Sequence, residues 1–310
     1  MDMNKAIITG ATGFIGKYLV KELVKQDVKV IAVVRENSRN ILEITSLPVK
    51  IIKCNICDYR LLPELIADRD IDAVFHFAWQ GVSDLDARDQ AIQIQNLQST
   101  LDLIDAMVKM SIKTFVGAGS LHEAEAIVEM QEDKMISNMG YMYKSAKIAA
   151  HWMGKAKSGN VGIRFFWPLI NTYGEGEKST RLINTIIRKI VLGEEPALSN
   201  GNQYYDFVHV EDVAHALYLI AEKGVDGTNY VIGSGQAKPL KEFLKVVGDI
   251  TNRMNGGTKV PLGFGQITAN VVSLPKETFD VTNLFRDTGF VPKISFDEGI
   301  IRTVKWIIGY

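Results

Sequence analysis

The chain has little of several features that mark specialised classes of protein. Only two of its 310 residues are cysteine, which excludes a disulfide framework and fits a reducing cytoplasm. The formal net charge is −1, so nothing indicates a nucleic-acid surface or a polybasic membrane patch. The longest apolar runs, such as residues 28–34, have the length of a strand and are too short to span a bilayer. The first strand is predicted to begin within about five residues of the start, which leaves no room for a signal peptide. We therefore expect a cytoplasmic protein.

The two cysteines form a C-x-x-C motif at Cys54 and Cys57. No Cys or His pair elsewhere in the sequence supplies the two further ligands of a structural zinc site, so we predict no metal site. A redox pair would place its first thiol at a helix N-terminus, whereas Cys54 follows a predicted strand. We expect both cysteines to be small buried residues.

Predicted strands and helices alternate through the first half of the chain. The strands are predicted at residues 6–9, 28–34, 50–53, 73–77, 114–117 and 162–166, and the helices at residues 13–25, 61–67, 90–110 and 142–157. Such alternation indicates βαβ units with right-handed crossovers. The fold class is therefore predicted as α/β, a doubly wound parallel sheet with its ligand at the carboxyl ends of the strands.

After Asn171 this alternation breaks down. Loops at residues 174–180 and 193–205 separate helices, residues 206–223 resemble a return strand and helix, and residues 296–308 a closing helix. We predict a dinucleotide-binding domain at residues 1–170 plus about 206–235, and a smaller substrate-binding lobe at residues 171–205 plus 236–310. The sequence contains no repeat, low-complexity tract or clear linker.

A glycine-rich loop follows the first predicted strand. Glycines at positions 10, 13 and 16 are spaced three apart, and the loop leads into a helix whose apolar face includes Leu19 and Leu23. A strand, a glycine turn and a helix together aim backbone N–H groups and the positive end of a helix dipole at a phosphate. This arrangement predicts dinucleotide binding, although the spacing differs from the commoner G-x-G-x-x-G.

A tyrosine and a lysine stand four residues apart at the start of a predicted helix. Tyr143 and Lys147 therefore share a helix face. A free phenol has a pKa of about 10 and is a poor acid–base catalyst at neutral pH, whereas a nearby ammonium group favours the phenolate and lowers that pKa. Taken alone, the pair is more typical of exposed helix side chains.

Together with the glycine loop and Ser120, just past the fifth predicted strand, this pair resembles the extended short-chain dehydrogenase/reductase family of nucleotide-sugar epimerases, dehydratases and reductases. Further segments extend the resemblance over almost the entire chain. Residues 72–79 resemble the family's fourth strand, Asn96-x-x-x-Thr100 its following helix, residues 171–174 its N-V-Y-G element and residues 206–214 its D-F-V-Y-V-D-D-V-A element. The resemblance implies a Rossmann-like sheet, NAD(P) as the cofactor and a nucleotide-linked sugar as the substrate.

The resemblance also implies roles for three residues. Tyr143 would exchange a proton with a sugar hydroxyl or carbonyl while hydride moves to or from nicotinamide. Lys147 would hold the nicotinamide ribose and tune Tyr143, and Ser120 would hydrogen-bond the reacting oxygen. The alternative for Ser120 is a serine in a turn at a strand end.

The end of the second predicted strand bears on the choice of cofactor. An acidic residue about 20 residues beyond the glycine loop binds the ribose 2′-hydroxyl of NAD. This chain has Arg35 at that position instead. Because a guanidinium binds a 2′-phosphate through charge-assisted hydrogen bonds, Arg35 favours NADP as the cofactor. The alternative is that Arg35 is solvated and Glu36 takes the ribose. Cofactor contacts are expected from Gly10, Thr12, Gly13, Phe14, Ile15, Gly16, Arg35, Ser38, Arg39, Asn55, Ile56, Phe77, Ala78, Trp79, Asn96, Ala118, Tyr143, Lys147 and Leu169.

The residues after Ser120 limit which of the family's reactions this chain is expected to catalyse. The family's 4,6-dehydratases carry an Asp-Glu pair there, where this chain has Leu121 and His122. Leucine cannot transfer a proton, so we reject dehydration as the reaction. His122 has no visible partner in the sequence and is interpreted as a loop residue. An NADP-type pocket suits a reductase, so we favour an NADPH-dependent reductase of a nucleotide-linked 4-keto-6-deoxy sugar. The alternative is a nucleotide-sugar C4-epimerase.

Two departures from the family pattern affect substrate binding. Tyr205 precedes the D-F-V element and Pro168 stands three residues before the Asn of N-V-Y-G, where the family often has Arg. Arg181 and Lys178 are the candidates to bind the diphosphate instead. Substrate contacts are expected from Gln80, Ser120, Glu123, Asn171, Lys178, Arg181 and Tyr205.

A hypothesis of another class is a non-catalytic NADP-binding sensor on the same fold. Such proteins typically lack the Tyr or the Lys, and both are present here. The family also leads us to expect a homodimer formed through the helices near residues 90–110 and 142–157. The apolar positions Leu101, Leu103, Ile104 and Met107 allow that interface but are equally able to pack on the sheet.

Overall fold

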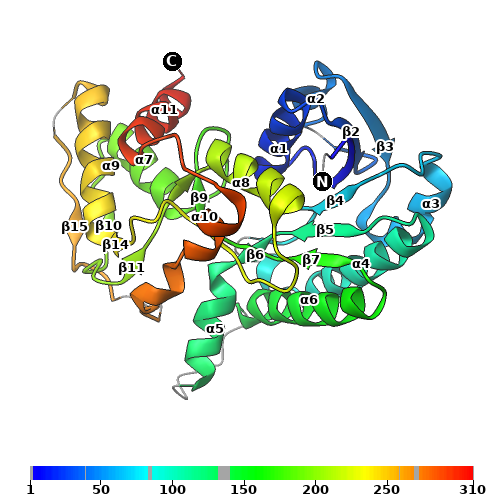
Figure 1. Ribbon diagram of the computed structural model, residues 1–310. Coiled ribbons are helices and arrows are strands. Elements are labelled where there is room, and N and C mark those ends of the chain that lie inside the picture. The colour runs from blue at the N-terminus through cyan, green and yellow to red at the C-terminus, as the bar shows by residue number, and fades with distance from the viewer. Residues whose placement is uncertain are drawn as a thin grey trace.

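The computed structural model describes residues 3–38, 40–82, 86–131, 140–257, 259–268 and 272–309. Its centre is a six-stranded parallel sheet in the order β3-β2-β1-β4-β5-β7 (Figure 1). The strands are β1 (Lys5–Thr9), β2 (Lys29–Val34), β3 (Val49–Lys53), β4 (Ala73–His76), β5 (Thr114–Gly117) and β7 (Arg164–Phe166). The strand order reverses between β1 and β4, which is the position at which such sheets bind ligands. The predicted α/β doubly wound fold is confirmed.

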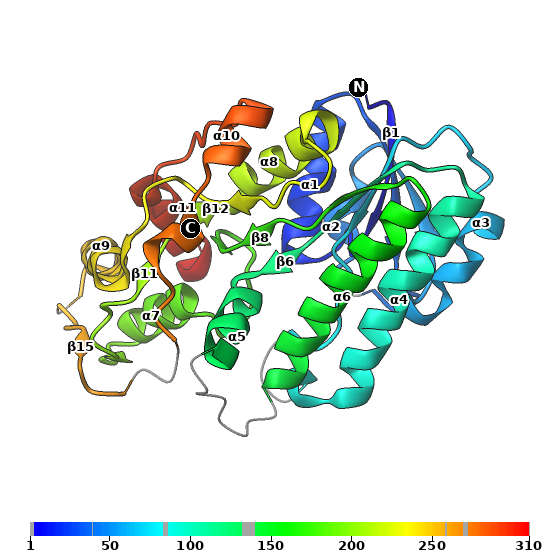
Figure 2. The same cartoon turned by 60° about the horizontal axis from the view of Figure 1, so that its bottom comes forward.

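The two faces of the sheet are covered by different helices. Ile8 of β1 packs into the core cluster on one face and its neighbour Ile7 into the cluster on the other, because successive side chains of a strand point to opposite faces. On the first face α1 and α8 pack together, and on the second α4 and α6 do so (Figure 2). These helices span Phe14–Lys25 (α1), Gln90–Lys109 (α4), Tyr141–Asn160 (α6) and Val210–Lys223 (α8). A sheet buried on both faces explains the continuous apolar runs of its strands.

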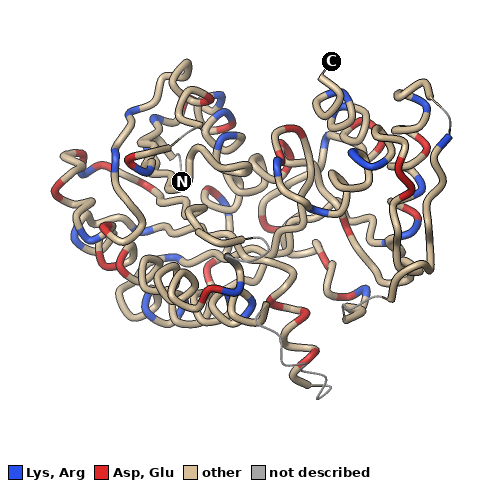
Figure 3. The backbone as a smooth tube through the Cα atoms, turned by 180° about the vertical axis from the view of Figure 1, so that it is seen from behind, with Lys and Arg blue, Asp and Glu red and all other residues tan. Residues whose placement is uncertain are grey.

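A separate core lies among the helices near the C-terminus. Ile187, Val247 and Val304 belong to it, and Figure 1 shows the helices that carry them to the left of the sheet. These helices are α7 (Leu182–Val191), α9 (Leu240–Asn255) and α11 (Phe296–Ile308), whereas the shorter α10 (Thr282–Thr288) packs against α8. Both signs of charge are distributed over the whole chain (Figure 3).

Short elements connect these parts. Three small parallel strands form one sheet, β6 (Gly119–Ser120), β8 (Leu169–Ile170) and β13 (Val231–Ile232). Two-stranded pairs are formed by β9 (Thr172–Tyr173) with β12 (Val208–His209), β10 (Ala197–Leu198) with β15 (Gly263–Phe264), and β11 (Tyr204–Tyr205) with β14 (Lys238–Pro239). The remaining helical segments are α2 (Leu42–Thr45), η1 (Ile56–Leu61), α3 (Leu62–Leu65), η2 (Asp86–Arg88), α5 (Leu121–Gln131) and η3 (Lys276–Phe279). In the described part of the chain no helix is long and apolar enough to cross a membrane.

One local prediction was too long and another was partly wrong. The helix expected near residues 61–67 is present as the shorter α3, which follows η1 directly and has Pro63 in its first turn. Cys54 is buried as expected, but Cys57 is exposed because it lies on the outer side of η1.

Two of the glycines that follow β1 are required because backbone atoms approach them closely. Gly10 has a φ of 71°, and a Cβ there would lie 2.5 Å from the backbone nitrogen of Ala78. A Cβ on Gly16, inside α1, would lie 2.1 Å from the carbonyl oxygen of Gly10. The glycines therefore allow α1 and the loop after β4 to pack closely against the end of β1.

We predict that Gly16→Ala destabilises the protein, because the new methyl group meets backbone that cannot move without shifting α1 from β1. The expected loss is about 1–3 kcal/mol of unfolding free energy in urea titrations. Gly159→Ala is the matched control, since a Cβ on this exposed residue of α6 meets nothing within 4 Å. The control should gain up to about 1 kcal/mol from helix propensity. Equal effects of the two substitutions would contradict the packing argument.

Candidate active site

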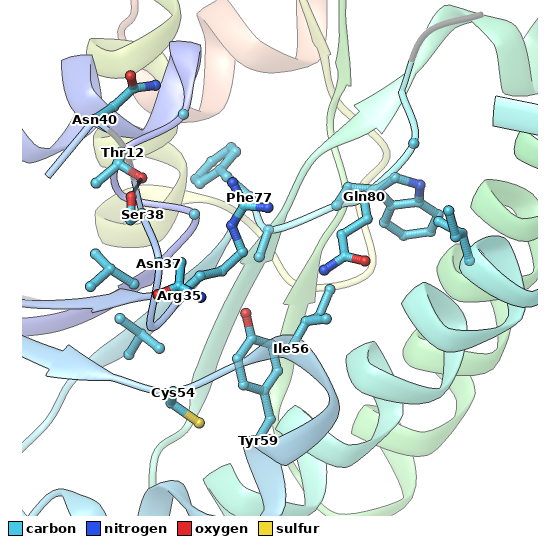
Figure 4. Close-up of a pocket in the computed structure, with 18 residues that line it drawn as sticks. Thr12, Arg35, Asn37, Ser38, Asn40, Cys54, Ile56, Tyr59, Phe77 and Gln80 are labelled. Atoms are coloured by element: carbon cyan, nitrogen blue, oxygen red, sulfur yellow. Dashed lines mark hydrogen bonds between the residues drawn. The ribbon is translucent and has the colours of Figure 1, made fainter. Parts of the chain in front are cut away.

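A cavity of about 750 Å³ opens at the carboxyl ends of β1, β2 and β4. Its walls come from the glycine loop, the turn after β2, the segment after β3 and the segment after β4. In Figure 4, Thr12, Ser38 and Asn40 lie at one end and Gln80 lies at the other. The N-terminus of α1 begins after Gly13, so its unpaired backbone N–H groups face this region.

Nine of the residues expected to contact a cofactor line this first cavity. They are Gly10, Thr12, Gly13, Arg35, Ser38, Ile56, Phe77, Ala78 and Trp79. The lining also contains Asn37 and Asn40, which the prediction missed although they follow β2 on the same edge of the sheet. Gln80, expected to contact the substrate, lines this cavity as well. Arg39 lies outside the described residues.

The polar lining of the cavity next to β2 is basic or neutral. Arg35 is exposed there, and the hydroxyls of Thr12 and Ser38 are hydrogen-bonded at 2.9 Å. Among the described residues that line the cavity, none is Asp or Glu. The backbone N–H of Glu36 donates to Oδ1 of Asn55 at 3.4 Å, so Asn55 ties the segments after β2 and β3 together.

The other predicted cofactor residues lie behind or beside the cavity. Phe14, Ile15 and Gly16 form the first turn of α1. The side chain of Asn96 exchanges two hydrogen bonds with the backbone of Gln80, at 2.9 Å and 2.8 Å, and so fixes the segment after β4. Leu169 belongs to β8, which pairs with the strand that carries Ser120.

Ser120, Tyr143 and Lys147 come together as the sequence predicts. Ser120 lies close enough to Tyr143 to act on the pKa of its phenol, and the ammonium group of Lys147 lies 6.0 Å from the centre of the Tyr143 ring. Lys147 is buried, donates to the carbonyl oxygen of Ala118 at 3.0 Å, and lies 3.6 Å from the centre of the Trp79 ring. The rings of Trp79 and Tyr143 meet edge to face at 6.2 Å. Trp79 therefore joins the first cavity to the Tyr–Lys pair.

The expected lowering of the Tyr143 pKa is not found. Burial raises the pKa of Tyr143, and the hydrogen bond from Ser120 and the charge of Arg181 oppose this without overcoming it. Burial also lowers the pKa of Lys147 to about 7, against an opposing effect of the Glu123 charge. The sequence places the two groups on one helix face, but it does not reveal how deeply that face is buried.

Glu123 is a buried carboxylate directly behind Ser120. Its Oε1 accepts from the backbone N–H of Ser120 at 2.8 Å and from Nε1 of Trp167 at 3.1 Å. Its Oε2 lies 3.1 Å from Nδ1 of His151. The carboxylate expected to touch substrate thus has its oxygens engaged by protein groups.

The contact between Ser120 and Glu123 also begins a helix that the prediction missed. Ser120 and Glu123 form a capping box, in which the Glu side chain returns to the backbone N–H of the capping residue. The S-x-x-E pattern is visible in the sequence and is the signal that identifies α5. The segment interpreted as a loop therefore begins a helix, with His122 in its first turn.

A second cavity, of about 180 Å³, lies on the C-terminal side of Ser120. It brings together four residues expected to bind substrate, namely Ser120, Asn171, Arg181 and Tyr205. Lys178, also expected there, instead pairs with Glu43 at 3.4 Å. The prediction missed His122 and Glu125, which line the same cavity and are hydrogen-bonded to each other at 2.7 Å.

Comparison with known proteins agrees with this geometry. The model of the NAD-dependent epimerase/dehydratase family matches residues 6–233, which confirms the family resemblance carried by the motifs. The chain is 24% identical to a dTDP-glucose 4,6-dehydratase of Haemophilus influenzae, over 99% of this chain and 98% of the relative.

Solved structures share the fold at lower identity. A UDP-glucose 4-epimerase of Thermotoga maritima, solved with UDP-glucose, has a TM-score of 0.80 at 22% identity and covers 98% of this chain and 99% of its own. The Bordetella bronchiseptica enzyme WbmF, solved with NAD⁺, has a TM-score of 0.76 at 23% identity and covers 99% of this chain and 93% of its own.

The burial of Lys147 predicts a pH dependence of stability. Its folded-state pKa of about 7 lies below the ordinary value of 10.5, so between these values the unfolded chain binds more protons than the folded chain. The unfolding free energy of the ligand-free protein should therefore rise with pH in this window, by up to about 1.4 kcal/mol per pH unit from this group. Urea titrations at pH 7.5 and 9 should show a smaller rise in Lys147→Met. An equal rise in both proteins would mean that Lys147 is charged when folded.

Proposed function

Because the chain belongs to the NAD-dependent epimerase/dehydratase family, we propose that it is an NADPH-dependent reductase of a nucleotide-linked 4-keto-6-deoxy sugar. The preference for NADPH is supported by the residues that line the first cavity next to β2. Arg35 with Asn37, Ser38 and Asn40 offers a cation and neutral donors, and none of the described lining residues is a carboxylate. A 2′-phosphate is attracted by such a lining, whereas a lone ribose hydroxyl would be left without an acidic partner.

The geometry around Tyr143 supports the proposed catalytic roles. The hydride for C4 of the sugar would come from a reduced nicotinamide bound in the first cavity. Tyr143, whose pKa is raised by burial, keeps its proton at neutral pH and is able to donate it to the oxygen that becomes a hydroxyl. Ser120 lies beside Tyr143 and would hold the same oxygen. Lys147 would bind the ribose hydroxyls next to Tyr143.

The second cavity suits the nucleotide-linked end of the substrate. Arg181 lines it, and its charge opposes the rise that burial causes in the pKa of Tyr143, so this arginine is the proposed partner of a diphosphate. Tyr205 stacks on Phe207 at 5.5 Å and offers a further flat surface there. Lys178, engaged by Glu43, would have to exchange partners to reach an anion.

The alternative is a C4-epimerase, the activity named for the Thermotoga maritima neighbour. An epimerase returns its hydride to the substrate and consumes no reduced cofactor, so net oxidation of NADPH separates the two. The third possibility, a non-catalytic NADP-binding sensor, is opposed by the close approach of Ser120, Tyr143 and Lys147.

A homodimer also belongs to the proposal. The buried positions Leu103, Ile104 and Met107 of α4 pack towards the sheet, so they are not the interface. Ile94 on α4 and Trp152 on α6 are exposed large apolar side chains, and α4 and α6 pack side by side (Figure 2). A second copy would cover them.

Tyr143→Phe should remove most of the activity, because it deletes the proton donor and keeps the ring. The measurement is the loss of NADPH absorbance with a panel of nucleotide-linked 4-keto-6-deoxy sugars. We expect a fall in kcat of about 100-fold or more. Tyr141→Phe, two residues away, is the control and should retain activity. Interconversion of C4 epimers without NADPH oxidation would replace the reductase by the epimerase.

Arg35→Ala should raise the KM for NADPH by about 10-fold or more, since a charge-assisted contact with the 2′-phosphate is lost. The KM for NADH should change little. Arg253→Ala removes an exposed arginine of α9 and controls for the change in net charge. A wild-type enzyme that uses NADH as well as NADPH would contradict the assignment of Arg35.

A further inference from the structure

A third cavity, of about 490 Å³, lies between α5 and α6, which pack against each other (Figure 2). Its walls include Ala124 and Ile127 of α5 and a stripe of α6 that contains Ile148 and Trp152. The described residues that line this cavity line neither the first cavity nor the second. A cavity of this size is large enough for a small organic ligand.

The charged groups of the third cavity give it a direction. Glu123 is buried and already engaged by protein donors, whereas Lys155 is exposed and lies one turn of α6 beyond His151. In the described part of the chain, Lys155 donates to the carbonyl oxygen of Gly227 at 3.2 Å and to Oδ1 of Asn229 at 3.4 Å. Because both acceptors are neutral, the positive charge of Lys155 attracts an anion. The charge of Glu123 repels an anion, so the anionic end of a ligand would point to Lys155.

The flat rings of the third cavity favour an aromatic ligand. The rings of His151 and Trp167 stack with centres 6.0 Å apart and planes 23° apart, and Phe165 stacks on Trp167 at 5.9 Å. Trp152 adds a further large ring, of which 68% is exposed. Because aromatic rings pack well in offset stacks, a flat apolar ring fits beside these side chains.

We propose that the third cavity binds a small aromatic carboxylate, which lowers the turnover of the protein. Its ring would lie against Trp152 and Trp167, and its carboxylate would pair with Lys155. A second copy of the chain is the competing occupant, because Trp152 also belongs to the proposed dimer face. The charge of Lys155, which no carboxylate among the described residues compensates, favours the small anion.

Two side chains belong both to the third cavity and to the surroundings of the Tyr–Lys pair. Glu123 accepts from the backbone N–H of Ser120 at 2.8 Å and from Nε1 of Trp167 at 3.1 Å. The ammonium group of Lys147 lies 5.2 Å from the centre of the Trp167 ring. A ligand that shifts Trp167 or Glu123 would therefore displace Ser120 and Lys147. Since catalysis depends on the exact placement of such groups, binding should lower kcat.

The binding test uses the whole protein with saturating NADP⁺. The probe is naphthalene-2-carboxylate, and naphthalene-2-carboxamide is its neutral counterpart. The indole N–H signals of isotope-labelled tryptophan, assigned with single Trp→Phe variants, report where the probe lies. We expect the signals of Trp152 and Trp167 to shift most and that of Trp306 on α11 to stay unchanged. The Kd of the carboxylate should be about 1 mM or lower, and the carboxamide should bind about 10-fold more weakly.

Lys155→Met removes the ammonium group and keeps a chain of similar length at an exposed position. It should weaken binding of the carboxylate by about 10-fold and leave binding of the carboxamide unchanged. Lys157→Met is the matched control on the same helix. Lys157 does not line the third cavity and pairs instead with Asp105 of α4 at 2.7 Å. Its variant should bind both compounds as the wild type does.

The kinetic test rests on the proposed reductase, whereas the NMR test does not. Saturating naphthalene-2-carboxylate should lower kcat for NADPH oxidation by about 5-fold or more and leave the KM for NADPH unchanged. At the same concentration of the carboxylate, Lys155→Met should lose this inhibition and Lys157→Met should keep it.

The outcomes separate the two proposals. A carboxylate that shifts neither Trp152 nor Trp167, or whose affinity is the same in Lys155→Met, would overturn the site. Binding that disappears when sedimentation shows a dimer would assign the cavity to the second copy and also overturn it. Binding at the site with an unchanged kcat would overturn the inhibition. Binding at the site by a protein that oxidises NADPH with no sugar of the panel would support the site and overturn the reductase.

Discussion

The arrangement of the candidate active site depends on the buried carboxylate of Glu123. It accepts from Ser120 and Trp167 and contacts His151, and its charge acts against the burial of Lys147. A carboxylate inside a protein is tolerated when donors surround it, and here the donors come from β6, α6 and the segment after β7. One side chain therefore fixes the start of α5, the backbone at Ser120 and the electrostatic environment of the Tyr–Lys pair.

The sheet could be predicted from the sequence because its determinants are local. Apolar runs such as that of β2 and the glycines after β1 can be recognised within windows of ten to fifteen residues, and the closing helix α11 has the predicted bounds. The segment from 121 to 131 was missed because its polar and charged residues give a weak apolar periodicity. Its capping box was the better signal. The separate core of α7, α9 and α11 depends on contacts between distant parts of the chain.

The sequence predicted which residues meet in the site better than it predicted their protonation and their hydrogen-bond partners. Ser120, Tyr143 and Lys147 were named from motif order, and the structure brings them together. The direction of the Tyr143 pKa was wrong because burial, which spacing does not reveal, outweighs the favourable groups. The partners of Glu123 and His122 could not be predicted either, because these contacts depend on the helical conformation of α5. Asn37 and Asn40 were missed because the sequence of a turn does not indicate which of its side chains face a cavity.

The exposure of Arg35 has a consequence for the stability of the fold. Five of the six residues of β2 are buried in the sheet, and the solvent-facing position begins immediately after it. Substitution of an exposed residue at the end of a strand perturbs stability little, whereas substitution within β2 would disturb the packing of both neighbouring strands. The proposed role of Arg35 therefore places the choice between the two nicotinamide cofactors at a position where substitution disturbs the core least.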